Sequence, residues 1–363
     1  MWIFDAHLDI SMNAVEWNRD LTRPLEEVRR REIGMSDKLD RGKGILTLEE
    51  MRRGRIGICI ATQIARFVAL DNPLPGWHSP EIAWSITQAQ LAWYRCMEEC
   101  GQMTQIRDRR QLARHVELWE NISDEEAMAA PIGYVLSLEG ADSIVHLDYL
   151  ERAYEYGLRA IGPAHYGAGR YSPGTGVEGG LTELGPDLLR KMDELGITLD
   201  CTHLTDEAFW QSLEIYEGPI WASHNNCRAL VPDQRQFSDE QLKAIIERDG
   251  VIGAAFDAWM MHPGWVRGVT DPRAAGVNIA RIIEQIDHVC QLAGNARHSG
   301  IGSDLDGGFG REQCPYDMES IADLQQVAVL LAERGYSDDD VHAIMHGNWV
   351  RRLESSLPEA ETC

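Results

Sequence analysis

The sequence predicts an α/β protein, a (β/α)8 barrel (a TIM barrel) with an insertion after the first strand. Eight short apolar runs recur along the chain, amphipathic segments separate them, and no low-complexity tract or linker divides the 363 residues. Strands that alternate with helices form parallel βαβ units, and eight such units suffice to close a barrel. Barrels of this length commonly form one unit, so we expect a single domain over residues 1–363.

The eight expected strands are short apolar runs, and several of them end in a histidine or a carboxylate. In chain order they cover residues 2–7, 55–62, 132–140, 158–165, 197–203, 219–224, 250–256 and 299–307.

The segments between these runs have the spacing and the end signals of helices. In PDLLRKMDELG, apolar residues from Leu188 to Leu195 recur at helical spacing and Gly196 follows. In SDEQLKAIIERDG, Ser238 can cap a helix with Gln241 three residues later, and a glycine closes the segment. Both segments therefore predict helices between strands.

Two further segments interrupt or follow the alternating pattern. Residues 18–50 are charged and lack strand periodicity, which predicts an insertion that is helical in part and covers the barrel mouth. The polar tail over about 353–363 is expected to be loose.

The composition excludes some classes of partner. The net charge is −24 and no basic patch offsets it, so we expect no nucleic-acid partner. No apolar stretch is long enough for a membrane span and no signal peptide precedes the first strand, so we expect no membrane partner. Cys59, Cys201 and Cys290 lie in apolar surroundings, as free cysteines do. These features indicate a cytoplasmic location.

Polar residues suited to metal binding and proton transfer stand at the ends of six predicted strands. They are His7 and Asp9 at the first strand, Glu139 at the third, His165 at the fourth, His203 at the fifth, His224 at the sixth and Asp304 at the eighth. A single histidine beside an apolar run is usually an ordinary hydrogen-bonded residue. The carboxyl ends of barrel strands, however, converge on one mouth, where active sites of this fold lie.

The number of these groups indicates more than one metal ion. Four histidines and three carboxylates exceed the needs of one tetrahedral zinc ion. They suit two ions that share a bridging carboxylate, with groups remaining for substrate and proton transfer. The residue types thus predict a metal-dependent hydrolase with a binuclear centre.

Four local sequences resemble the renal (membrane) dipeptidase family, zinc peptidases of the amidohydrolase superfamily. These are SLEGAD (137–142), GGLTELGPDLLRKMDELGITLDCTHLTDEAFW (179–210), ASHNNCRALVPDQRQFSDEQLKAI (222–245) and GIGSDLDGG (300–308). The resemblance is nearly continuous over 132–308, and the His-x-Asp opening extends it to the N-terminus. Residues 18–120 match only loosely. The opening also departs from the family pattern: the family usually has His-Asn-Asp, and here Leu8 takes the place of the asparagine between His7 and Asp9.

The resemblance implies a role for each matching residue. His7 and Asp9 would bind one zinc ion, His203 and His224 a second, and Glu139 would bridge the two. Asp304 would be the acid and base that exchanges a proton with the metal-bound water and the leaving amine. Spacing alone leaves Asp306 as an alternative, since strand alternation would place both carboxylates on one side.

Two further contacts with the substrate follow from the same resemblance. His165 would support the oxyanion of the tetrahedral intermediate. Arg235 would bind the C-terminal carboxylate of the substrate, with Arg228 as the second candidate for that duty. Arginine binds a carboxylate through two parallel hydrogen bonds, which suits selection of a free C-terminus.

The function implied is a zinc dipeptidase that cleaves dipeptides with a free C-terminal carboxylate by attack of metal-bound hydroxide. The family accepts a D-residue at the C-terminal position and its members often dimerise, so D-containing dipeptides and a homodimer are expected. Another amide or lactone hydrolase of the amidohydrolase type, or an N-acyl amino acid deacylase, is the alternative. A catalytically silent binding barrel is a third hypothesis, but it predicts damage to the ligand set, and every ligand position is filled.

Overall fold

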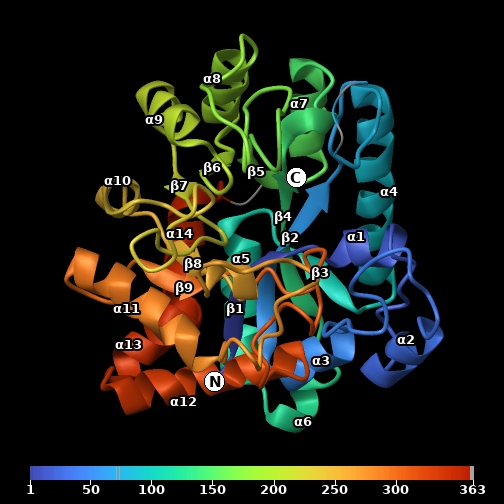
Figure 1. Ribbon diagram of the computed structural model, residues 1–363, viewed down its shortest axis with the longest axis vertical. Coiled ribbons are helices and arrows are strands. Elements are labelled where there is room, and N and C mark those ends of the chain that lie inside the picture. The colour runs from blue at the N-terminus through green and yellow to red at the C-terminus, as the bar shows by residue number, and fades with distance from the viewer. Residues whose placement is uncertain (71, 73, 360–363) are drawn as a thin grey trace.

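A computed structural model of the chain describes residues 1–70, 72 and 74–359. Within these residues one parallel sheet has the strand order β7-β6-β5-β4-β2-β1-β9-β8, and β3 pairs with β4 beside this path (Figure 1). The strands are β1 (Ile3–Leu8), β2 (Ile56–Ile64), β3 (Met103–Gln105), β4 (Ile132–Glu139), β5 (Leu158–Gly162), β6 (Thr198–Asp200), β7 (Ile220–Trp221), β8 (Ile252–Ala254) and β9 (Ser299–Ile301).

The two ends of this strand order meet and close the barrel. Directly after β7, Ala222 forms a parallel bridge with Ile252 of β8. The amide of Ala222 donates to the carbonyl of Val251 at 3.0 Å, and the amide of Gly253 donates to the carbonyl of Ala222 at 2.8 Å. The predicted (β/α)8 barrel is therefore confirmed.

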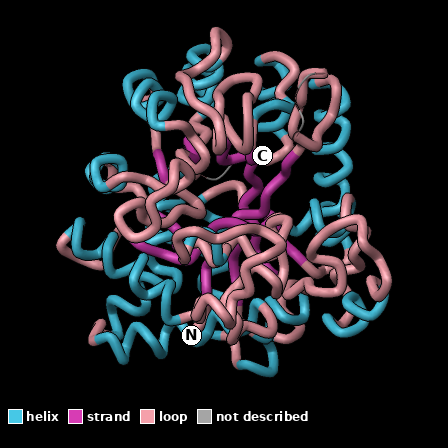
Figure 2. The backbone as a smooth tube through the Cα atoms, in the orientation of Figure 1, coloured by secondary structure: helices cyan, strands magenta, loops and turns pink. Residues whose placement is uncertain are grey.

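Helices surround the strands on the outside of the barrel (Figure 2). They are α1 (Ile10–Val15), α2 (Leu25–Arg31), α3 (Leu48–Arg53), α4 (Pro80–Glu99), α5 (Arg109–Asn121), α6 (Asp124–Ala127), α7 (Leu147–Glu155), α8 (Gly185–Leu195), α9 (Asp206–Ile215), α10 (Asp239–Glu247), α11 (Ala280–Ala293), α12 (Gln325–Arg334), α13 (Asp338–His342) and α14 (Asn348–Ser356).

The end signals read from the sequence act largely as expected. Ser238 and Gln241 form a reciprocal capping box at the start of α10. Gly196 ends α8 in the left-handed conformation, with φ 69°. At the other end of α10 the helix stops at Glu247, before Gly250, because Asp249 takes the left-handed turn with φ 54°.

The strands differ from the prediction in number and in length. The short strand β3 was not expected. It pairs with the first residues of β4, whereas β5 pairs with β4 from Leu136 onward. The expected strands that contain His165, His203, His224 and Asp304 end early, so these four residues lie in loops just beyond the sheet. His203 and Asp304 have φ values of 69° and 59°, which no extended strand can contain.

The insertion and the tail have defined structure. Residues 18–50 contain α2 and the beginning of α3, in line with partly helical character. The tail was expected to be loose from about residue 353, but α14 runs to Ser356. Both Leu353 and Leu357 are buried, because the apolar face of this helix packs on the barrel. Residues 360–363 of the expected tail lie outside the described residues.

Buried apolar side chains form two clusters. The larger one contains residues from the strands and from the helices around them. The smaller one joins strand residues such as Phe4 and Trp221 to Trp119 of α5 and Trp349 of α14. Close packing also requires glycine at position 253, where a Cβ atom would collide with the carbonyl oxygen of Ser223. This packed barrel holds its strand ends in a fixed arrangement.

Candidate metal centre and active site

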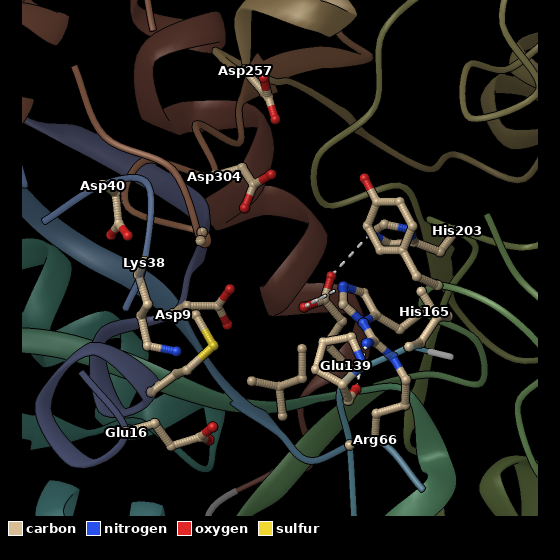
Figure 3. A pocket seen from close by; sticks show the side chains of 18 of the residues that line it. Asp9, Glu16, Lys38, Asp40, Arg66, Glu139, His165, His203, Asp257 and Asp304 are labelled. Atoms are coloured by element: carbon tan, nitrogen blue, oxygen red, sulfur yellow. Dashed lines mark hydrogen bonds and ion pairs between the residues drawn. The ribbon is translucent and has the colours of Figure 1, made fainter. Parts of the chain in front are cut away.

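The polar side chains predicted at the strand ends meet at one mouth of the barrel. Figure 3 shows five of them around the cavity, namely Asp9, Glu139, His165, His203 and Asp304. His7 belongs to β1 and Asp9 follows it, Glu139 ends β4, His165 follows β5, His203 follows β6, His224 follows β7 and Asp304 follows β9. The five candidate metal ligands among them are all buried. The parallel register therefore brings together residues that are up to about 300 positions apart in the sequence.

The Glu139 carboxylate lies between two groups of possible ligands. Its Oε1 atom is 3.2 Å from Nε2 of His203, 3.3 Å from Nε2 of His224 and 3.5 Å from Nε2 of His7. Nε2 of His7 is in turn 4.0 Å from Oδ2 of Asp9. One carboxylate thus faces a His7–Asp9 side and a His203–His224 side.

Hydroxyl groups behind the two histidines turn their Nε2 atoms inward. Oγ1 of Thr175 is 2.8 Å from Nδ1 of His203, and Oγ of Ser223 is 2.9 Å from Nδ1 of His224. The two Nε2 atoms then face each other at 3.2 Å. A histidine that ligates a metal uses its second nitrogen in this way, because that contact fixes the ring orientation.

Two buried atoms at the centre lack a hydrogen-bond partner among the described residues. They are Nε2 of His7 and Oδ1 of Asp9. Buried polar atoms normally have partners, and imidazole nitrogens with carboxylate oxygens are ligands that zinc and similar cations take. The residues present therefore fit metal ions at this centre.

The surroundings of Glu139 and of the histidines on one side of it favour the protonation states that bind cations. Burial would raise the pKa of Glu139, but His165, His7 and the other histidines around it hold the pKa well below its ordinary value. Burial, with nearby Arg235, lowers the pKa of His203 far below its ordinary range. Metal ligation requires this state, an ionised carboxylate beside neutral imidazoles.

His7 has the opposite tendency. Burial acts to lower its pKa, but the carboxylates of Glu139, Asp9 and Asp304 raise the pKa to about 10. A site with this excess of negative charge attracts a positive one, either a proton or a metal cation. Protons and metal ions therefore compete at His7.

Asp304 and Asp306 point to different places. Asp304 lines the cavity, with Oδ1 3.9 Å from Nε2 of His7. Asp306 accepts from the backbone amides of Ile45 and Leu46 at 3.0 Å, away from the centre. Strand alternation does not apply to them, because β9 ends at Ile301 and both aspartates have left-handed φ values. Burial raises the pKa of Asp304 well above its ordinary value.

The two candidate arginines are also separated by the fold. Arg235 is buried and lines the cavity; its Nη1 donates to Oδ1 of Asn225 and its Nη2 to the carbonyl of His224. Arg228 is bound by the carboxylate of Asp206 through two hydrogen bonds of 2.7 and 2.8 Å, and it does not line the cavity. Of the two candidates for the substrate carboxylate, the geometry thus favours Arg235 over Arg228.

His165 lies at the edge of the centre and has a partner that the sequence did not suggest. Its Nε2 is 3.8 Å from Oε2 of Glu139, and Nη2 of Arg66 approaches its Nδ1 at 2.7 Å. Burial, with Arg66 and Arg235 nearby, lowers the pKa of His165 to about 3. The ring is therefore neutral.

Arg66 and Asp257 are among the charged residues of this cavity that the sequence analysis did not identify. Arg66 follows β2 and Asp257 follows β8, so both stand at strand ends like the residues that were found. Burial raises the pKa of Asp257 to about 7. The signal was the same strand-end position, but an arginine is not a usual metal ligand and Asp257 follows the apolar run by one residue.

The cavity around the centre has a volume of about 640 Å³. The barrel forms its floor, and Lys38, Leu39 and Asp40 of the insertion form part of its wall. The ammonium group of Lys38 lies 3.7 Å from the centre of the Trp17 ring. The insertion therefore shapes the space beside the candidate metal centre.

A family comparison matches the chain almost from end to end. The model of the membrane dipeptidase family, peptidase family M19, covers residues 1–360. The chain belongs to this family. The family resemblance inferred from the sequence is thus confirmed, and membership makes the protein a metal-dependent hydrolase.

Individual relatives agree with the family assignment. An uncharacterized dipeptidase of Schizosaccharomyces pombe is 28% identical over 225 residues, which are 61% of this chain and 52% of the relative. The chain therefore aligns with about half the length of that dipeptidase. Among the described residues, no helix combines the length and the apolar character needed to cross a membrane.

Solved structures of low sequence identity share the fold. The metallopeptidase "dipeptidase AC" superposes with a TM-score of 0.75 at 23% identity, over 98% of this chain and 99% of that one. A metallopeptidase from Rhodobacter sphaeroides, liganded with a phosphinate mimic of the dipeptide L-Ala-D-Ala, has a TM-score of 0.74 at 22% identity, with the same coverage.

Proposed function

We propose that the protein is a binuclear zinc dipeptidase that hydrolyses dipeptides with a free C-terminal carboxylate, including those with a C-terminal D-residue. The position of Glu139 carries this proposal. Its Oε1 atom lies within 3.5 Å of Nε2 of His7 on one side and of His203 and His224 on the other. A carboxylate in this position suits a bridge between two cations.

Each side of Glu139 would hold one zinc ion. His7 and Asp9 are the ligands on one side, and His203 and His224 are the ligands on the other. When bound, a pair of ions lowers the pKa of a water molecule and polarises the carbonyl group of a substrate.

Asp304 and His165 then act on the reacting atoms. Asp304 accepts a proton from the attacking water and delivers it to the nitrogen of the leaving amine, which is general base followed by general acid catalysis. Its place in the cavity near His7 supports this role. His165 donates a hydrogen bond to the substrate oxygen as that atom becomes negative.

Arg235 binds the C-terminal carboxylate of the substrate. It is buried, it lines the cavity, and its Nε atom has no hydrogen-bond partner among the described residues. The hydrogen bonds to Asn225 and to the carbonyl of His224 hold the guanidinium in place. An arginine fixed in this way loses little side-chain entropy when a carboxylate binds.

The relative from Rhodobacter sphaeroides supports the stereochemical part of the proposal. That protein holds a mimic of L-Ala-D-Ala on the same fold. We extend this substrate class to the present chain, whose cavity of about 640 Å³ has room for a dipeptide.

A substrate panel tests the function. Zinc-loaded protein is given L-Ala-L-Ala, L-Ala-D-Ala, the C-terminal amides of both, N-acetyl-alanine and simple lactones. We expect turnover of the free dipeptides and at least a tenfold lower kcat/KM for the amides, because the amides remove the charge that Arg235 binds. Hydrolysis of N-acetyl-alanine or a lactone without turnover of any dipeptide would replace the proposal with a deacylase or lactonase.

A further inference from the structure

Arg66 is a cavity residue that the proposed reaction leaves without a role. It follows β2, its side chain is half-buried, and it points toward His165 and Glu139 (Figure 3). Its Nη1 donates to the carbonyl of Pro75 at 2.9 Å. This loop is also anchored at the next residue, where the amide of Phe67 donates to Oδ2 of the buried Asp142 at 3.0 Å. The fold thus holds the guanidinium in one position.

The contact between Arg66 and His165 specifies which imidazole nitrogen carries a proton. Nη2 of Arg66 is 2.7 Å from Nδ1 of His165. A guanidinium group has only donors, so Nδ1 must be the acceptor in this hydrogen bond. A ring whose Nδ1 is an acceptor is neutral and has its single proton on Nε2.

The protonated nitrogen is the one that faces the metal centre. Nε2 of His165 is 3.8 Å from Oε2 of Glu139. The ring also packs edge-on against His203 and Tyr166, with centroids 4.7 and 4.9 Å away. His165 therefore offers an N–H group to the cavity and no lone pair.

We propose that Arg66 is a positioning residue that holds His165 as a neutral hydrogen-bond donor toward the reacting carbonyl group. The catalytic consequence rests on the proposed function, whereas the assignment of the proton rests on the contact itself. Without Arg66, the ring can rotate and can take its proton on either nitrogen. The donor is then absent in part of the molecules when negative charge develops on the substrate oxygen.

Nitrogen NMR of the imidazole rings tests the proton position directly. Zinc-loaded protein is labelled with ¹⁵N at histidine, and the signals of His165 are identified by their loss in His165→Gln. In the wild type we expect a protonated Nε2 and an unprotonated Nδ1. In Arg66→Met we expect a changed tautomer pattern, and in Arg66→Lys, which keeps a cationic donor, the wild-type pattern. A wild-type ring with its proton on Nδ1, or an unchanged pattern in Arg66→Met, would overturn the proposal.

Dipeptide kinetics test the consequence for the reaction. We expect Arg66→Met to lower kcat about 10–100-fold with KM within about twofold, because an oxyanion contact acts only in the transition state. Arg66→Lys should recover most of that loss. A raised KM at unchanged kcat would instead assign Arg66 to direct substrate binding and overturn the positioning role.

Arg170→Met serves as the matched control. Arg170 lies near the same Asp142, to which its backbone amide donates at 2.7 Å, but it does not line the cavity. Its loss should leave kcat within about twofold. Bound zinc and the thermal midpoint are measured for every variant, so that a folding defect is recognised. If the wild type does not cleave dipeptides, the proposed function fails, and the wild-type ¹⁵N pattern still decides the proton position without any kinetic assay.

Discussion

Asp304 and Glu139 are carboxylates of one cavity that differ in their surroundings. Imidazole groups surround Glu139 and hold its pKa well below the ordinary value despite its burial. Burial raises the pKa of Asp304 well above its ordinary value. The neighbouring carboxylates, Glu139 among them, raise it further, although His7 opposes the shift. At the scale of single residues, one group is suited to bind cations and the other to carry a proton.

Asp304→Asn separates proton transfer from metal binding. Asparagine tolerates the left-handed backbone at this position, φ 59°, so the change removes the charge and little else. We expect kcat to fall about 10²–10⁴-fold while bound zinc stays at the wild-type level. Steady-state kinetics and metal analysis check this, with the exposed Asp148→Asn as a control. Activity near the wild-type level would contradict the acid–base role of Asp304.

Glu139→Gln should act on the metal itself. The amide nitrogen that replaces one carboxylate oxygen cannot ligate a cation, and the negative charge between the two sides of the centre is lost. We expect about two bound zinc ions per chain in the wild type and fewer than one in the variant after dialysis. Metal analysis by mass spectrometry measures this. An unchanged zinc content would show that Glu139 does not bridge the ions.

At the scale of elements, the insertion is tied to the barrel by a buried ionic network. The guanidinium of Arg19 donates to Glu32 at 2.9 Å and to Asp40 at 2.9 Å, and it lies 3.8 Å from Asp306. Asp306 in turn accepts from the amides of two insertion residues, Ile45 among them. One buried arginine thus holds the insertion, which carries Lys38 and Asp40 at the cavity wall, against the loop after β9.

Arg19→Met should loosen this insertion. The change leaves the buried carboxylates of Asp40 and Asp306 without their cation, whereas Glu32 keeps its pair with Arg41. An unpaired buried charge typically costs about 3–5 kcal/mol of unfolding free energy. We expect a lower urea midpoint and faster proteolytic cleavage within residues 18–50. Arg23→Met is the matched control, because Arg23 lies in the same segment and forms an exposed pair with Asp20. Equal cleavage rates in the two variants would contradict the anchoring role.

At the scale of the whole molecule, two buried histidines hold the beginnings of the first barrel strands. Nε2 of His115 on α5 contacts the carbonyl of Gly57 at 3.0 Å, and Nδ1 of His346 contacts the carbonyl of Trp2 at 3.1 Å. Burial lowers the pKa of each histidine to about 4. Both therefore stay neutral in the folded protein at pH values where they are charged in the unfolded chain.

Acid should consequently destabilise the barrel. Between pH 6.5 and about 4 the unfolded chain binds more protons than the folded one, so the unfolding free energy falls as the pH falls. Each histidine contributes up to about 3 kcal/mol to this loss. We expect His115→Gln to flatten the pH dependence of urea unfolding across this window, and the exposed His78→Gln to leave it unchanged. A slope equal to that of the wild type in His115→Gln would contradict the assignment.

Prediction from the sequence reached furthest where a pattern is local. The barrel, the capping box at Ser238 and the gathering of His7, Glu139 and His224 at strand ends all follow from apolar runs and the residues that terminate them. The strand β3 escaped prediction because its three residues carry no periodic signal. The tail was misjudged because its buried leucines are recognisable only once α14 packs on the barrel.

The candidate site shows the same division. Spacing could not separate Asp304 from Asp306, or Arg235 from Arg228, since the members of each pair are close in sequence and alike in chemistry. Left-handed backbone conformations direct Asp304 into the cavity and Asp306 toward the insertion. Asp206, at the start of α9, engages Arg228, so that Arg235 is the member of this pair that lines the cavity.

The sequence alone predicts the barrel and the set of imidazole and carboxylate groups at its mouth, because periodicity and strand-end position are properties of short segments. Only the folded chain selects among similar neighbours and supplies contacts across long separations. The 2.7 Å contact between Arg66 and His165 joins residues 99 positions apart, and no local pattern contains it. Long-range packing therefore specifies how the groups at the mouth are oriented and where their protons lie.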